Sequence, residues 1–148
     1  MKTFIVSLIA LTATSLIAAE PSKQDFLKRD LNGIQGSWKL VALAFDGQPA
    51  PPEIVSTLKL VFRDDTLTFK PGEPGFTNYK YKLDPAITPA SFTMIHAGGT
   101  NKGESENGIY SLVGDQLKIC FGRGNQRPNE LTARAGSGQS MYSLEREK

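Results

Sequence analysis

The run GSWKLVALAF, residues 36–45, is the most informative stretch of this chain for its fold. Residues 38–45 are predicted to form a β-strand, and Asp46-Gly47 with the prolines that follow ends it, because these residues favour turns. Side chains alternate between the two faces of a strand, which places Trp38, Leu40 and Ala42 together. A strand that buries such a face needs partner strands, and the residues that follow supply them.

Short runs of alternating apolar and polar residues follow along the rest of the chain. Arg63-Asp64-Asp65 and Gly114-Asp115 separate two pairs of these runs, as in tight hairpins. A single helical turn is possible at 53–57, but no longer helical pattern lies between the runs, and parallel strands need a long crossover connection. The sequence therefore predicts a mainly β, antiparallel up-and-down fold, a barrel or a sandwich, of eight or nine strands. The predicted strands after the first are 58–62, 66–69, 76–83, 91–96, 104–113, 116–121, 130–134 and 139–146.

The residues before the first strand have a different period. Phe26, Leu27, Leu31 and Ile34 have helix-like spacing, and Ser22 is a suitable N-cap residue. A short helix of two or three turns is predicted over residues 22–34.

The first 19 residues have the pattern of a secretory signal peptide. Met1-Lys2 precedes an uncharged run, residues 3–19, that ends in Ala18-Ala19. An uncleaved membrane anchor is the weaker interpretation, since a spanning helix needs about 20 predominantly apolar residues. We therefore expect a single exported domain, residues 20–148, in the periplasm or outside the cell. The chain would meet the membrane only in transit.

The composition of the 148-residue chain excludes several classes of chemistry. One Cys cannot form an internal disulfide or a cysteine-based zinc cluster, and one His cannot supply the His pairs of common zinc sites. The net charge of +2 is too small to make nucleic acid the default partner. We therefore expect a monomer with no metal, no cofactor and no nucleic acid.

Two resemblances favour the barrel over the sandwich. Gly36-Ser37-Trp38 at the start of the first strand resembles the Gly-x-Trp of lipocalins, which implies an indole at the closed end of a barrel with a basic side chain, here Arg146, over it. Residues 33–148 closely resemble a family of small exported lipocalin-like domains of unknown function, expanded in planctomycete bacteria. At Leu131 the family pattern leads us to expect an aromatic residue. The resemblance implies a fold and no activity. The segments that carry it are 34–38, 46–49, 108–112, 114–121, 127–131, 136–139 and 144–146.

A barrel of eight strands is wide enough to be filled by side chains or to hold one small ligand. We therefore predict a non-catalytic binding module for a small apolar or amphipathic molecule. A fully packed interior is the alternative, and the chain would then act as a protein-interaction domain through loops such as 98–106 and 122–129. The residues predicted to line the ligand pocket are Leu40, Ala42, Leu60, Phe62, Tyr79, Tyr81 and Tyr110.

A hydrolase-like enzyme that uses His96 or the loop bearing Arg123 and Arg127 is the third alternative, although no catalytic residue is predicted. His96 and Cys120 are the one nucleophile–base combination in the sequence, with Asp115 or Glu104 to orient the base. A structural role is expected for both, with Cys120 substantially buried.

Two further groups of charged residues suggest sites, but simpler roles are expected. The arginines Arg123, Arg127 and Arg134 suggest an anion-binding loop, and we expect an ordinary solvated loop. Asp64 and Asp65 lack the spacing of a calcium loop and are expected to form a turn. Lys80 and Lys82 are expected on a solvated strand face.

Overall fold

The structure is a computed structural model that describes residues 18–70 and 78–148. The predicted signal peptide, residues 1–19, lies outside the described residues except for its last two positions. Among the described helices none is both long enough and apolar enough to cross a membrane.

The predicted N-terminal helix is confirmed as α1, Lys23–Ile34. Ser22 is its N-cap and forms a capping box with Asp25. The Ser22 hydroxyl accepts a hydrogen bond from the Asp25 amide at 3.3 Å, and the Asp25 carboxylate accepts one from the Ser22 amide at 2.8 Å. The predicted helical turn is also present, as α2, Pro52–Thr57, with proline at its first position.

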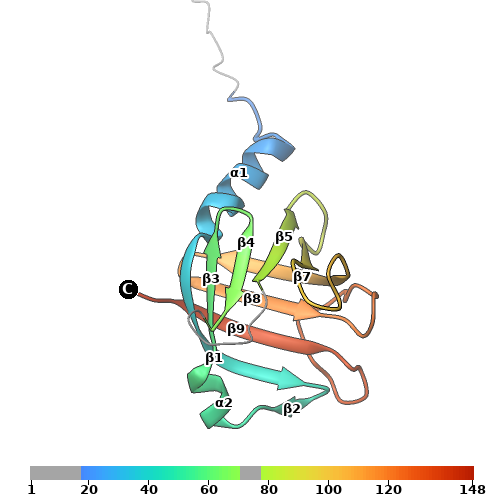
Figure 1. Cartoon of the computed structure of the whole chain (residues 1–148). Helices are drawn as coiled ribbons and strands as arrows, with labels where there is room; N and C mark the ends of the chain where they lie inside the picture. The colour runs from blue at the N-terminus through green and yellow to red at the C-terminus, as the bar shows by residue number, and fades with distance from the viewer. Residues whose placement is uncertain (1–17, 71–77) are drawn as a thin grey trace, which may run out of the picture.

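The strands form one closed antiparallel barrel, which confirms the predicted fold class (Figure 1). Eight strands pair in chain order, and β1 pairs with β9 to close the ring. The two-residue β2 pairs with the end of β1 as a ninth strand. The bounds are β1 Gly36–Phe45, β2 Gln48–Pro49, β3 Lys59–Arg63, β4 Thr66–Phe69, β5 Asn78–Asp84, β6 Ser91–His96, β7 Ser105–Val113, β8 Gln116–Phe121 and β9 Ser140–Arg146.

The two ends of the barrel differ. At one end, called here the α1 end, the helix lies beside the β3–β4 turn, and the Gln35 side chain at its C-cap bonds to Asp64 of that turn (Figure 1). The β7–β8 turn lies at the same end, because Asp115 pairs with Arg146 at the end of β9. The opposite end, the loop end, has the longer connections and α2.

Aromatic rings fill much of the barrel interior. Phe62 contacts Tyr81 with ring centroids 5.1 Å apart, and Phe92 contacts Tyr81 at 5.9 Å and Phe121 at 5.8 Å. Gly108 faces Phe121 across the strand pair, where a Cβ atom would lie 2.9 Å from its ring and 2.7 Å from the Cys120 carbonyl oxygen. Glycine at this position therefore leaves room for the rings.

The predicted position of Ala42 on the interior face is wrong. Leu40 pairs with Leu144 and Ala42 with Ser143, so Val41 is an extra residue in β1 opposite β9. Such a β-bulge shifts the alternation of side chains by one residue. Val41 and Ala42 are exposed as a result, and Leu43 packs against the core instead.

The predicted strand at residues 130–134 is also wrong. These residues belong to an irregular β8–β9 connection, 122–139. Both edges of β8 are already paired, with β7 and with β9, and a closed barrel offers no free edge there. The connection instead covers the outer side of β8, where the Cys120 thiol donates a hydrogen bond to the Thr132 carbonyl at 3.3 Å.

Candidate functional site

Trp38 and Arg146 close the α1 end of the barrel. The Trp38 side chain is fully buried, and its indole N–H donates to the Ile34 carbonyl at 2.7 Å. The guanidinium carbon of Arg146 lies 4.3 Å from the centroid of the indole ring, which is cation–π geometry. Arg146 also donates to the Gln35 carbonyl at 2.7 Å and the Gly33 carbonyl at 2.5 Å. This basic side chain thus satisfies the carbonyls that the end of α1 leaves unpaired.

A buried hydrogen bond links α1 to the barrel wall. Tyr110 on β7 donates to the Asp30 carboxylate at 2.5 Å, and Asp30 is only 6% exposed. Arg29 pairs with the same carboxylate at 2.9 Å from its outer side. Burial and the hydrogen bond to Asp30 raise the pKa of Tyr110. The helix is therefore part of the closure of the barrel.

The residues predicted to line a ligand pocket do not share one cavity. Leu40, Leu60, Phe62, Tyr81 and Tyr110 are each at most 5% exposed and belong to the core cluster. Tyr79 is half-buried at the loop end, where it contacts Phe69. Ala42 lies outside the barrel, beside a surface hollow between β1 and α2. Core packing thus accounts for five of the seven residues.

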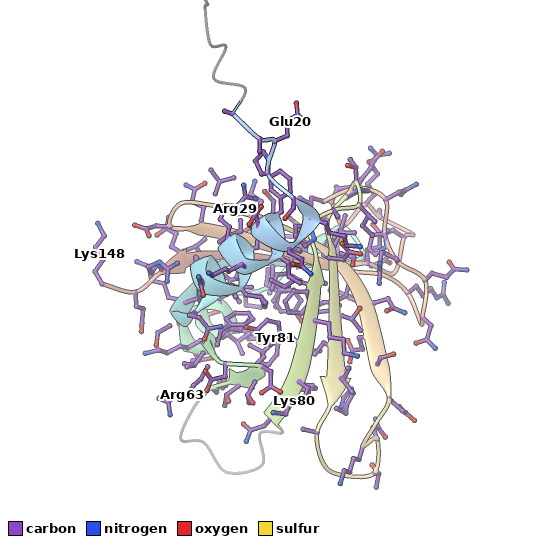
Figure 2. All side chains as sticks on the ribbon, turned by 90° about the horizontal axis from the view of Figure 1, so that it is seen from above. Glu20, Arg29, Arg63, Lys80, Tyr81 and Lys148 are labelled. Carbon is purple, nitrogen blue, oxygen red and sulfur yellow. The ribbon has the colours of Figure 1, made fainter. Side chains whose placement is uncertain are left out.

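A groove of about 630 Å³ lies between α1, the β3–β4 turn and β5. Its apolar wall consists of Leu27 and Leu31 from the helix and Leu83 from β5. Figure 2, viewed from the side that α1 covers, shows Tyr81 next to the helix on the inner side of the strands. The polar residues of the groove are Asn32, Gln35, Asp64, Asp65, Tyr81 and Lys82.

The Gln35 side chain links the end of α1 to the β3–β4 turn and to β5. Its side-chain amide donates to the Tyr81 hydroxyl at 2.9 Å and the Asp64 carbonyl at 3.1 Å, and its side-chain oxygen accepts from the Asp64 amide at 2.8 Å. The Tyr81 hydroxyl donates to the Asp64 carbonyl at 2.7 Å, and burial raises the pKa of Tyr81. This network fixes the distance between helix and sheet, so the groove is preformed.

A second cluster of side chains, which the sequence analysis missed, lies at the loop end. Phe69, Tyr79, His96, Glu106 and Tyr142 come from five different strands and meet across the interior. His96 Nε2 lies 3.2 Å from Oε1 of Glu106. Glu106 lies two residues before Gly108 and four before Tyr110, so the three residues are on the same face of β7. Its inward orientation could have been predicted from that spacing, but Glu106 was not among the predicted site residues.

The hypothetical pair of His96 and Cys120 is not formed. His96 points inward and contacts Tyr79 and Glu106, whereas Cys120 lies on the outer face of β8 beneath the β8–β9 connection. Asp115 pairs with Arg146 at the other end of the barrel. Cys120 is fully buried, as predicted.

The Cys120 thiol is expected to be unreactive in the folded protein. Burial raises its pKa, and the thiolate is the reactive form of cysteine. Titration with Ellman's reagent at pH 8 should label less than about a tenth of the native protein within minutes and one thiol per chain after unfolding in guanidinium. A Ser56→Cys variant, which carries an added exposed thiol, serves as the control for rapid labelling. Rapid labelling of the parent protein would contradict this assignment.

The arginines of the β8–β9 connection do not gather into an anion site. Arg134 pairs with Glu130 at 2.7 Å. Arg127 donates to the Thr93 hydroxyl and to the side-chain oxygen Oδ1 of Asn107, both at 3.3 Å, on the outer face of the barrel. The predicted role of Asp64 and Asp65 as turn residues is confirmed.

Lys80 lies on the exposed face of β5, as expected. Its ammonium group hydrogen-bonds to Asp65 at 2.6 Å and lowers the pKa of that carboxyl. Lys82 is exposed on the same strand.

Within residues 18–70 and 78–148, no three His, Cys, Asp or Glu side chains lie close enough together to hold a metal ion. Comparison of the chain with protein-family models, with curated proteins and with solved structures found no match.

Proposed function

We propose that this protein is an exported, non-catalytic binding module that holds a small amphipathic molecule in the groove between α1 and β5. The observation that carries the proposal is the groove itself, which combines an apolar wall with a polar rim. Its volume lies within the usual range for small-molecule sites, about 300–1,000 Å³. The closed β-barrel is compatible with a lipocalin-like binding module.

The chemistry of the groove supports an amphipathic ligand. Leu27, Leu31 and Leu83 offer apolar contact along its length. Asp65 at the rim is paired with Lys80, and the remaining charged residues, Asp64 and Lys82, have opposite signs, so the rim has no strong preference for either sign. The apolar part of the ligand would lie against the leucines, and its polar part would remain at the solvent-exposed rim.

Binding in the groove differs from the sequence-based expectation of a ligand inside the barrel. A molecule at the position of Phe62, Tyr81 and Phe92 would have to separate rings that contact one another. Opening such a cavity costs packing energy at every ring. The groove needs no such displacement.

The proposal is tested with 1-anilinonaphthalene-8-sulfonate, an amphipathic dye that fluoresces on apolar surfaces. Leu27→Gln replaces a leucine of the apolar wall and should weaken binding of the dye about ten-fold or more. The control is Ile54→Gln, which changes an exposed apolar residue on α2 and should leave the affinity unchanged. Equal affinity in the Leu27→Gln variant would exclude the groove as the binding site.

A further inference from the structure

The cluster at the loop end combines aromatic rings with a carboxylate. Phe69 on β4 contacts Tyr142 on β9 with ring centroids 6.4 Å apart, although these strands are not neighbours in the sheet. Tyr79 on β5 contacts Phe69 at 5.5 Å. Glu106 on β7 lies opposite Met94, one inward position away from His96. Side chains of separate strands thus converge on one region above the aromatic core.

We propose that this loop-end cluster binds a small organic cation, with the Glu106 carboxylate as the counter-charge and the rings of Phe69, Tyr79 and Tyr142 as the walls. This site is separate from the groove at the α1 end. It differs in chemistry as well, because it offers a negative charge among aromatic faces.

The orientation of the rings supports a cation. The planes of Phe69 and Tyr79 are inclined by 71°, and those of Phe69 and Tyr142 by 73°. Both contacts are edge-to-face, so the edge of one ring meets one face of the other, and the faces of the first ring stay free of its partner. All three side chains are partly exposed. The face of an aromatic ring carries negative potential, and several faces around one position attract ammonium groups, as in the cages that recognise choline and methyl-lysine.

The carboxylate of Glu106 supplies the negative charge of the proposed site. Its side chain is 46% exposed, and among the described residues its carboxylate contacts His96 and has no lysine or arginine within 4 Å. Burial, and then the negative charge of Glu106, raise the pKa of Tyr79, and the same two causes raise the pKa of Tyr142. The geometry agrees, because the ring of His96, which contacts the Glu106 carboxylate, lies with its centroid 4.9 Å from that of Tyr79. His96 holds the carboxylate in place at 3.2 Å.

Choline and its uncharged isostere 3,3-dimethylbutan-1-ol are the probes that test this site. The two molecules have nearly the same shape, so a difference in affinity reports the charge. Calorimetric titration of the purified protein should show choline binding at least ten-fold more tightly than the alcohol. Glu106→Gln keeps the size of the side chain and should weaken choline binding about ten-fold or more. Glu104→Gln removes an exposed acid two residues away and should have no effect.

Equal binding of the two probes, or unchanged choline binding in Glu106→Gln, would overturn the proposal. Phe69→Leu gives an independent measure if Glu106→Gln does not fold, because it removes one ring and keeps an apolar side chain. Choline should bind to this variant several-fold more weakly, and an unchanged affinity would again overturn the proposal. Leu27→Gln should bind choline like the parent protein, so failure of the groove and failure of the loop-end site are distinguishable.

Discussion

Replacement of Trp38 by alanine is expected to lower the free energy of unfolding by about 3–5 kcal/mol, the range for removal of a large buried aromatic side chain. The indole is fully buried, and its loss leaves a cavity at the α1 end that the surrounding backbone cannot fill. It also leaves the Ile34 carbonyl without its donor and removes the ring that Arg146 covers. Trp38→Phe should lower the free energy of unfolding by less, because it keeps an aromatic ring and loses mainly the hydrogen bond of the indole N–H.

Guanidinium unfolding followed by far-ultraviolet circular dichroism measures this effect. Tryptophan fluorescence is unsuitable, since Trp38 is the single tryptophan of the chain. Val113→Ala is the matched control, because Val113 is 70% exposed and its truncation should change the free energy by less than about 0.5 kcal/mol. A loss below about 1 kcal/mol in Trp38→Ala would show that the indole does not hold the α1 end together.

The second large effect is expected at alkaline pH. Burial raises the pKa of all four tyrosines of the sequence, Tyr79, Tyr81, Tyr110 and Tyr142. In the unfolded chain a tyrosine titrates near pH 10. A pKa that is higher in the folded state means that folding favours the neutral phenol. This contribution to stability is complete below about pH 10 and is lost as the pH rises through the folded-state values.

Absorbance of tyrosinate at 295 nm measures this titration. At about pH 10.5 the folded protein should show less than half of its tyrosines ionised, whereas the chain in guanidinium should show more than half. At higher pH the remaining signal should appear together with the loss of circular dichroism. Titration of all four tyrosines near pH 10 with an intact far-ultraviolet spectrum would contradict the burial described here.

The regular elements were predictable because local patterns determine them. The capping box at Ser22 and the turns at Asp64-Asp65 and Gly114-Asp115 depend on residues close together in the sequence. Closure of the barrel followed from the number of strands and from the resemblance at Gly36-Ser37-Trp38. The partnership of Trp38 and Arg146 came from that resemblance together with the alternation of the last strand.

The wrong predictions concern features that depend on residues far apart in the sequence. The bulge at Val41 depends on how β1 fits β9, more than 100 residues away, and it moved Ala42 to the outside. The segment 130–134 has a strand-like pattern, but the edges it would need are occupied by other strands. An inward-facing residue can either pack in the core or line a ligand pocket. Contacts between rings across the barrel decide between these two roles, and they place Phe62 and Tyr81 in the core.

The candidate sites themselves lie where distant segments meet. The groove needs the helix beside β5, a juxtaposition set by Gln35 and by the Asp30–Tyr110 hydrogen bond across 80 residues. The loop-end cluster needs Glu106 to face inward beside His96. Alternation with Gly108 and Tyr110 could have indicated that orientation, but Glu106 was not a predicted site residue, and the neighbours of its carboxylate come from other strands.

The pairing of β1 with β9 sets the order of events when the chain is made. Trp38 and Arg146 are partners across the ring, so the barrel cannot close until residue 146 has left the ribosome. Contacts so far apart in sequence form slowly, because a long loop must close before they form. Until β9 is available, the edge of β1 that pairs with it in the closed barrel has no partner. Unpaired strand edges can pair with other chains, so the chain is exposed to aggregation until the last strand is in place.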